Sequence, residues 1–310
     1  MPYTVPRVQT VPLPDDEVSI RVDGHERLRW HAAHRYPRPF FYPLVGPSGR
    51  SLTRMGHPAD PTHDHHRSLW WAHHDVAGVS FWEEHRDRPG GPHIRQDAWV
   101  HYQDGPDEAG LAVRIGWYDA HAVRLIGQEM IAVYRPLDRG EGWLELQATF
   151  TPALDELTLG KTNFGFVGLR VAASLSAHYG GGRLTNSDGA AGEKGVFAKR
   201  ARWLDYSGPI TPEATEGVTW FDHPSNPRYP TYWHARDDGW MSAAFSLPDT
   251  YGLRKDRPLR LRYGLHVHAG GLDPARAEER AKAFADTAAW QVAPAPRPWQ
   301  KVLRRAETPT

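Results

Sequence analysis

The sequence predicts an all-β fold, a large antiparallel β-sandwich with a single helix near its C-terminal end. The chain has 310 residues, among them 13 Trp, 12 Tyr, 29 Gly and 27 Pro, and this composition favours many short strands separated by turns. Segments in which apolar and polar residues alternate recur along most of the chain. No segment of helix length interrupts them, which is typical of a sandwich and not of alternating strand–helix units.

The first strand candidate is residues 18–22, in which Val18, Ile20 and Val22 share one face because side chains alternate along a strand. Turn clusters rich in Gly and Pro, such as residues 88–92 and 180–182, separate the later candidates. These later candidates are residues 111–117, 128–134, 143–150, 164–175, 240–246 and 259–267.

One helix is predicted at about residues 274–289. Asp273 can cap its N-terminus, and Pro274 suits its first turn. Its apolar side, which includes Ala277, Ala281, Phe284 and Ala288, is expected to pack on the edge of the sheet. We therefore expect one sandwich domain at residues 1–292 and a Pro-rich, weakly ordered tail at residues 293–310.

The balance of charges excludes several classes of partner. Lys and Arg number 37, and so do Asp and Glu, so no excess charge favours nucleic acid or an anionic membrane. Cys is absent, which excludes disulfides, thiolate nucleophiles and Cys-based zinc sites. No secretory signal pattern is visible, and no stretch approaches the roughly eighteen consecutive apolar residues of a membrane span. We expect a cytoplasmic protein that binds a small molecule; its oligomeric state stays open.

Residues 63–75 are the richest segment for chemistry, with five His, two acidic residues and two Trp. Histidine titrates near neutral pH and is the commonest metal ligand, whereas Trp offers a flat face to a sugar. Alternation would place Trp70 and His74 on one face of a strand and Trp71 on the other, so that one Trp packs in the core and one lines a cleft. Asp75 could orient His74; alternatively, both Trp residues are core and His74 only ends a turn.

Two His-x-His pairs offer a metal site. In each pair, His63 with His65 and His266 with His268, both side chains point the same way on a strand, roughly 7 Å apart at a rise of about 3.3 Å per residue. If the pairs faced each other, they and a nearby acid could hold zinc or non-haem iron. Alternatively, the first pair lies in an exposed loop after Pro61 and Thr62.

The segment 222–237 contains three Pro residues and no alternation, and is therefore predicted to be a long loop. Its aromatic residues, Trp233 among them, argue against disorder. It supplies His223 and His234 for acid–base chemistry, and Arg228 and Arg236, whose guanidinium groups recognise carboxylates or vicinal oxygens. The alternative is a rigid surface lid whose charges pair with each other.

A Gly-rich segment at residues 186–194 allows close approach of a ligand to the backbone. It does not match a phosphate-binding loop, because neither the Gly spacing nor a Lys-Ser/Thr pair is present. Asn186, Glu193 and, in the next segment, Asp205 are candidates for the site; ordinary surface roles are the alternative.

Four blocks of the chain carry a resemblance to a known family: residues 66–75, 163–170, 203–208 and 222–228. They are similar to a soluble bacterial family that carries the label PmoA. The resemblance covers about residues 40–285. It implies a genomic association with sugar-catabolic oxidoreductases, but it supplies no catalytic residues.

At the level of the fold, the sequence also resembles galactose-mutarotase-like sandwiches. These place a pair of histidines and a carboxylate in a concave sheet lined by Trp, Arg and Asn. By this analogy His66 or His74, His223 or His234, and Glu193 or Asp205 would fill the corresponding roles.

The leading expectation is a carbohydrate-active enzyme that acts on a sugar or keto-sugar, with a His as general acid and a carboxylate or second His as base. Epimerisation, elimination and hydrolysis stay open. The alternatives are a non-catalytic sugar-binding module and a metal-dependent oxygenase or hydrolase, and a divalent metal is the one cofactor considered. The expected catalytic residues are His66, His74, His223, His234, Glu193 and Asp205; those expected to bind substrate are Arg67, Trp70, Trp71, Asp75, Asn163, Asn186, Arg228, Trp233 and Arg236; the metal candidates are His63, His65, His266 and His268.

Overall fold

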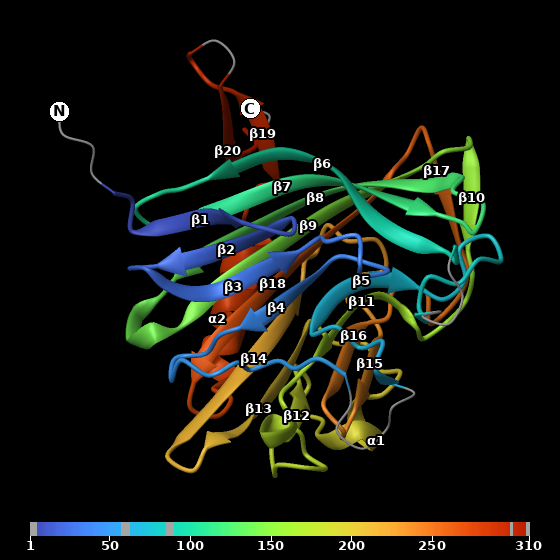
Figure 1. The fold of residues 1–310 in the computed structure, drawn as a ribbon. Helices are drawn as coiled ribbons and strands as arrows, with labels where there is room; N and C mark the ends of the chain where they lie inside the picture. Colours follow the sequence, from blue (N-terminus) through green and yellow to red (C-terminus); the bar gives the residue numbers. More distant parts are fainter. Residues whose placement is uncertain (1–4, 57–62, 85–89, 298–299, 308–310) are drawn as a thin grey trace.

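Two large antiparallel β-sheets pack face to face around one hydrophobic core (Figure 1). The computed structural model describes residues 5–56, 63–84, 90–297 and 300–307. Within these ranges each large sheet has eight strands, and the helices are few and short. The predicted all-β sandwich is therefore confirmed.

The first sheet joins the N-terminal strands to three short strands from the middle of the chain. Its strands, in spatial order, are β1 (Val8–Leu13), β2 (Glu17–Val22), β3 (His25–His31), β4 (Phe40–Leu44), β5 (Leu69–His73), β11 (Gly165–Arg170), β16 (Trp240–Ala243) and β15 (Trp233–Arg236).

The second sheet contains the longest strands. In spatial order they are β12 (Arg183–Asn186), β13 (Trp203–Thr211), β14 (Ala214–Asp222), β18 (Leu259–Ala269), β9 (Gly142–Pro152), β8 (Arg124–Pro136), β7 (Ala109–Tyr118) and β6 (His93–Gln103). Two further pairs are β10 (Glu156–Leu159) with β17 (Tyr251–Arg254), and β19 (Trp290–Pro294) with β20 (Lys301–Arg305). The helical segments are α1 (Gly192–Val196), α2 (Pro274–Ala285) and the 3-10 turns η2 (Asp138–Gly140) and η3 (Ala173–Leu175).

Alternation along the strands decides which side chains reach the core. On β5, Leu69 and Trp71 point into the core between the sheets, so Trp70 lies on the outer face of the first sheet. There it joins an aromatic cluster, which we call the outer aromatic cluster and which consists of Phe40, Trp70, Ala72, Trp82 and Trp240.

The outer face of the second sheet is covered by α2 and by the β19–β20 hairpin. The N–H of Arg276 donates to the Asp273 carboxylate (3.1 Å), so the predicted cap of α2 is confirmed, although α2 ends at Ala285 and not near residue 289. Phe284 packs against Trp143 beneath the helix.

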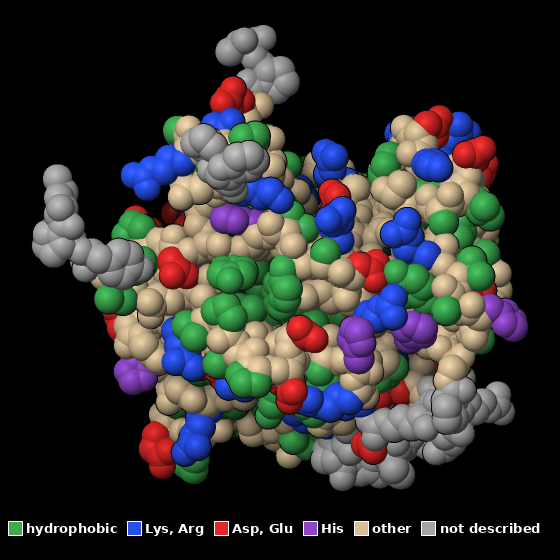
Figure 2. Space-filling model, turned by 45° about the horizontal axis from the view of Figure 1, so that its top comes forward, with side chains coloured by type: hydrophobic (Ala, Val, Ile, Leu, Met, Phe, Trp, Pro, Cys, Tyr) green, Lys and Arg blue, Asp and Glu red, His purple; other side chains and the backbone are tan. Residues whose placement is uncertain are grey.

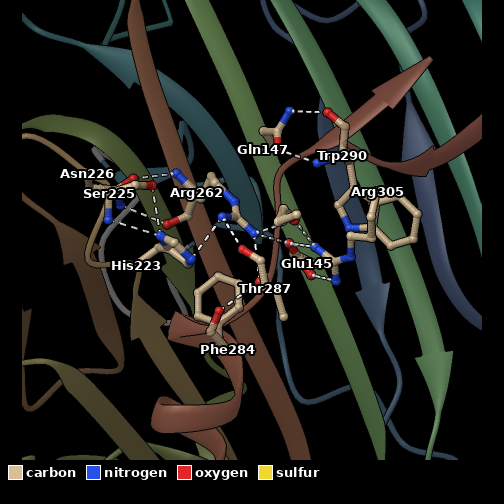
Figure 3. A network of polar contacts seen from close by, with 11 residues as sticks. Glu145, Gln147, His223, Ser225, Asn226, Arg262, Phe284, Thr287, Trp290 and Arg305 are labelled. Carbon is tan, nitrogen blue, oxygen red and sulfur yellow. Dashed lines mark hydrogen bonds and ion pairs between the residues drawn. The ribbon is translucent and has the colours of Figure 1, made fainter. Parts of the chain in front are cut away.

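Where the sequence predicts a weakly ordered tail at residues 293–310, the structure has the hairpin β19–β20. Leu303 is buried, and Arg305 forms an ion pair with the buried Glu145 of β9 (2.6 Å), which also pairs with Arg262 of β18 (3.0 Å; Figure 3). Residues 298–299 and 308–310 of that predicted tail lie outside the described residues.

Two predicted boundaries differ from the structure. The strand candidate 164–175 is β11 followed by η3, because η3 turns the chain at residues 173–175. The predicted loop 222–237 begins at the end of β14 and contains the whole of β15. In β15 only four residues alternate, too few to stand out in the sequence.

No helix in the described part of the chain is long and apolar enough to cross a membrane. On the face drawn in Figure 2, acidic and basic side chains are interspersed around a central group of hydrophobic side chains. This mixture agrees with the equal numbers of positive and negative residues.

Candidate functional site

A cleft of about 540 Å³ opens on the outer face of the first sheet, beside the outer aromatic cluster. It brings the histidines at residues 63–66 together with the end of the segment 222–237, which the sequence separates by more than 150 residues. The residues that line the cleft are His63, His65, His66, Trp82, Glu83, Asn163, Phe164, Arg170, His234, Arg236, Asp238 and Trp240.

Aromatic rings form much of the cleft wall. The His66 ring stacks on that of Trp240, with centroids 4.8 Å apart and an interplanar angle of 22°. The rings of Trp82 and Phe164 are 5.5 Å apart. Such flat apolar faces can pack against the C–H face of a sugar ring.

His66 is a buried, neutral imidazole. Burial lowers its pKa far below the ordinary value, and the positive charge of Arg170 lowers it further. Its Nδ1 is sealed from solvent and has no hydrogen-bond partner among the described residues, so the cleft can reach the ring only through Nε2. A buried N–H at Nδ1 would have no acceptor, which assigns the proton to Nε2. His66 therefore presents a hydrogen-bond donor to the cleft.

His234 is the opposite tautomer, with its proton on Nδ1. It lies on β15, where Trp233 and Ala235 point into the core and His234 points outward. Its Nδ1 is 2.9 Å from the backbone oxygen of Asn163, and because a carbonyl can only accept, Nδ1 carries the proton. Nε2 is then the unprotonated nitrogen and carries the lone pair, with the Asn163 amide nitrogen 3.5 Å away. Burial lowers the pKa of His234 to about 4, so the ring is neutral at pH 7.

Arg170 forms the buried base of the cleft together with Asp238. Its Nη1 and Nη2 donate to the two carboxylate oxygens of Asp238 at 3.0 Å each. Burial lowers the pKa of Arg170, and the Asp238 carboxylate opposes that effect. Both terminal nitrogens of Arg170 are thus engaged.

Arg236 lies at the rim, half exposed. Its Nε is 3.1 Å from Glu193 Oε1. Glu193 is itself fixed, because its Oε2 accepts from the N–H of Asp237 (3.1 Å) and its own N–H donates to the Asp237 carboxylate (2.9 Å). Glu193 therefore positions the guanidinium group and does not line the cleft.

Glu83 is the other carboxylate of the cleft wall. Burial alone would raise its pKa, but a hydrogen bond from the Ser80 hydroxyl and the charge of His74 lower it overall, so Glu83 is ionised. His74 lies 3.1 Å from Glu83 and is about half exposed. The predicted catalytic residue His74 thus acts on the cleft only through Glu83.

Three tryptophans that the sequence predicts to bind substrate are buried and do not line the cleft. Trp71 packs in the core against Phe150 and Tyr263. Trp233 is fully buried and its Nε1 donates to the backbone oxygen of Ala201 (2.9 Å), so neither can touch a ligand. Trp70 is 1% exposed and supports the cleft from beneath, as part of the outer aromatic cluster.

His223 is also not at the cleft. It lies on the outer face of the second sheet, where its Nε2 accepts from Arg262 Nη1 (2.8 Å) and its Nδ1 contacts the Ser225 hydroxyl (2.8 Å; Figure 3). Burial and the charge of Arg262 lower its pKa to about 4. The predicted catalytic His223 is therefore a structural residue that supports Arg262.

The two His-x-His pairs do not face each other. Leu265 and Val267 point into the core, so His266 and His268 lie on the outer face of the second sheet, whereas His63 and His65 line the cleft on the first. His266 pairs with Glu141 (2.8 Å) and His268 pairs with Asp205 (2.9 Å). Asp205, a predicted catalytic residue, is consequently far from the cleft. Among the described residues, no group of three or more His, Asp or Glu side chains is arranged to hold a metal ion.

The other predicted ligand-binding residues are engaged by backbone groups or, in the case of Arg67, by a neighbouring carboxylate. Arg67 forms an ion pair with the buried Glu84. The Asp75 carboxylate accepts from the N–H of Gly78 (2.8 Å). The side chain of Asn186 accepts two N–H groups of its own turn, and Arg228 donates to three carbonyl oxygens of residues 245–250.

Sequence reasoning missed six residues of the cleft wall. One signal was available: Arg170 ends an apolar strand segment, where a charged residue is unusual. For the rest, the strand order had to be known, because pairing of β11 with β16 sets Arg170 opposite Trp240. The six are Trp82, Glu83, Phe164, Arg170, Asp238 and Trp240.

Comparison with known proteins places the chain in a family. The model of DUF6807, described as a family of unknown function, matches residues 17–282. That range holds every described residue of the cleft wall. No curated protein matches the chain.

Proposed function

The chain belongs to DUF6807, a family of unknown function, and we propose that it is a carbohydrate-active enzyme that uses His/carboxylate acid–base chemistry on a sugar or keto-sugar. The observation that carries the proposal is the pair of neutral imidazoles in one cleft, His66 with an N–H and His234 with a lone pair. Both contact the same ring, that of Trp240.

These proton states favour removal of a proton from a carbon next to a carbonyl group. His234 Nε2 accepts that proton as general base, and His66 Nε2–H donates to the carbonyl oxygen as its negative charge grows. Delivery of a proton from solvent water to the opposite face, with release of the first proton from His234 to water, gives epimerisation; loss of a neighbouring substituent with the proton from His234 gives elimination.

Glycoside hydrolysis has less support. It needs a protonated carboxylic acid beside the glycosidic oxygen. Glu83 is ionised, and Asp238 gives both oxygens to Arg170. A His acting as general acid, which the sequence suggested, would have to be protonated, whereas both buried imidazoles are neutral at pH 7.

The test is exchange of a sugar C–H for solvent deuterium. Aldoses, ketoses, aldonates and uronates are incubated with the enzyme in D₂O, and proton NMR follows loss of the C–H signal and formation of new products. H234N keeps the donor to Asn163 but removes Nε2, so exchange should fall by about 100-fold or more. H66Q, which retains a donor near the Nε2 position, should keep more activity than H66A.

The control variant is H121A, because His121 is exposed on a turn, and it should exchange at the wild-type rate. Ligand binding without exchange, or full exchange by H234N, would overturn the catalytic proposal. Binding without exchange would identify the alternative, a non-catalytic sugar-binding module.

Two resemblances of the sequence agree with this proposal. The four blocks that resemble the PmoA-labelled family all fall inside residues 17–282, and the paired-histidine cleft on a sheet supports the analogy to galactose-mutarotase-like proteins. A cytoplasmic location and a small sugar-like ligand stay predictions. The balanced charge supports the further prediction that neither nucleic acid nor a membrane is a partner.

A further inference from the structure

We infer that the substrate is a sugar acid, and that Arg236 binds its carboxylate next to the carbon from which His234 removes the proton. The inference rests on the proposed function, because it names the substrate class of the same cleft. Four observations on Arg236 and its neighbours lead to it.

The first is the position of Arg236 relative to the proposed base. His234 and Arg236 are two residues apart on β15, with Trp233 and Ala235 pointing into the core on the other side. Their side chains therefore leave the same face, roughly 7 Å apart at a rise of about 3.3 Å per residue. A carboxylate held by Arg236 places its neighbouring carbon within reach of His234.

The second is that the two terminal nitrogens of Arg236 are available as hydrogen-bond donors. Within the described ranges, Arg236 forms one ion pair, through Nε to Glu193. Glu193 is held in place by its two hydrogen bonds with Asp237. Among the residues that the structure describes, Nη1 and Nη2 of Arg236 have no protein partner. The side chain is 51% exposed. By contrast, both Nη atoms of Arg170 are taken by Asp238.

The third is the match between donor and anion. A guanidinium group held at one nitrogen presents its remaining N–H groups in a fixed plane, and a carboxylate accepts two such bonds side by side. A phosphate dianion fits less well, because the ionised Glu83 and Asp238 line the same cleft and repel the second charge.

The fourth is that the charge of Arg236 affects the pKa of His234, the proposed base. After burial, the charge of Arg236 is a further cause that lowers the pKa of His234, while the Asn163 carbonyl opposes it. A bound carboxylate neutralises Arg236 and so makes His234 a stronger base when substrate is present. The free enzyme keeps the imidazole neutral and ready to accept.

The chemical step balances without a further reactant. His234 Nε2 takes the proton from the carbon next to the carboxylate, and the electron pair of that C–H bond moves into the carboxylate group, whose charge Arg236 stabilises. The pair then returns to carbon as solvent water supplies a proton to the opposite face and His234 releases its own proton to water, or the pair expels the neighbouring oxygen substituent, which leaves with the proton from His234.

The test compares matched pairs of ligands by isothermal titration calorimetry: D-glucuronate with D-glucose, and D-galacturonate with D-galactose. The expected result is that the acid of at least one pair binds about 10-fold or more tightly than its neutral partner, since only the acid forms charged hydrogen bonds with the guanidinium group. R236Q should lose that difference, R236K should keep part of it, and neutral sugars should bind R236Q as they bind wild type.

The control is R257Q, because Arg257 is exposed on a turn outside the cleft, and it should retain the preference for acids. Inorganic phosphate and glucose 6-phosphate form a separate arm; tighter binding of these than of the uronates would overturn the assignment to a carboxylate. Equal binding of acid and neutral sugars, or a preference that survives in R236Q, would overturn it too.

The failures of the two proposals are distinguishable. If uronates bind through Arg236 but no C–H exchange occurs, the sugar-acid inference stands and the catalytic function fails. If a neutral keto-sugar exchanges its proton and R236Q does not slow this reaction, the catalytic function stands and the sugar-acid inference fails.

Discussion

The imidazole of His66 lies flat against the indole of Trp240, with ring centroids 4.8 Å apart and an angle of 22° between the planes. The same indole contacts His234 edge-to-face at 5.9 Å. One aromatic side chain therefore fixes both imidazoles that we propose as catalytic groups. Trp240 is itself held between Trp70 and Trp82.

Replacing Trp240 should separate packing from catalysis. W240A removes a buried ring from the outer aromatic cluster, and we expect the free energy of unfolding to fall by about 3–5 kcal/mol. W240F keeps a ring and should cost less stability, but it should still slow turnover because the two imidazoles lose their shared support. Urea unfolding and the turnover number measure the two effects; a W240F enzyme as active as wild type would contradict this role for Trp240.

The stability of the protein should fall in mild acid because of buried neutral histidines. His223 has its pKa lowered to about 4, against an ordinary value of about 6.5 in the unfolded chain. The unfolded chain therefore takes up the proton first as pH falls. The stabilising contribution of neutral His223 is complete above about pH 6.5 and is lost between about pH 6.5 and pH 4, with an upper limit of about 3 kcal/mol.

The variant H223Q isolates that contribution. Gln can still accept from Arg262 but does not titrate, so the loss of stability between pH 6.5 and pH 4 should be smaller than in wild type. The neighbouring Asp222, whose pKa burial raises to about 7, acts with the opposite sign, and it is present in both proteins. Urea midpoints across this pH range give the comparison, with H121A as control; parallel curves would contradict the role of His223.

The ion pairs of Glu145 should be important for attachment of the C-terminal hairpin. Glu145 is 1% exposed and joins Arg262 of β18 (3.0 Å) to Arg305 of β20 (2.6 Å). In E145Q the two guanidinium groups lose their shared counter-charge, and we expect a loss of about 3–5 kcal/mol in the free energy of unfolding. R305Q should cost less, because Arg305 is partly exposed.

The matched control for E145Q is R254Q. Arg254 also pairs with a carboxylate, that of Asp256 (2.9 Å), but both groups are exposed and screened by water, so its removal should leave the urea midpoint nearly unchanged. Limited proteolysis of residues 290–305 gives a second readout. The hairpin should be cleaved faster in E145Q than in wild type, and equal cleavage would contradict the role of Glu145.

Much of the fold could be predicted because long strands repeat their pattern. β18 alternates over eleven residues, with Leu261, Tyr263 and Leu265 in the core, and this period is visible in the sequence. Four-residue strands such as β15 leave no such pattern, and their place depends on pairing with distant segments. The hairpin β19–β20 was missed for a similar reason, since Arg305 is stabilised by Glu145, which is distant in sequence.

The site was only partly predictable for a topological reason. His223 follows the end of β14 in the second sheet, and His234 lies on β15 in the first. The ten residues between β14 and β15 therefore carry the chain from one layer to the other, and they separate two histidines that look equivalent in the sequence. Residue type identified His66, His234, Asn163 and Arg236, but Arg170 and Trp240 join them only through the order of strands in the first sheet.

The separation of the two His-x-His pairs also gives a prediction about metal content. His266 and His268 are paired with the buried carboxylates Glu141 and Asp205, on the outer face opposite the cleft that His63 and His65 line. The two pairs therefore cannot jointly coordinate one ion.

We expect protein purified without an affinity tag to contain less than about a tenth of an equivalent of zinc or iron, because a complete site binds such ions tightly. Elemental analysis measures this, and dialysis against a chelator should leave both the melting temperature and C–H exchange unchanged. A stoichiometric metal whose removal abolishes exchange, and which H63A with H65A no longer retains, would instead favour the metal-dependent alternative and assign the ion to the cleft.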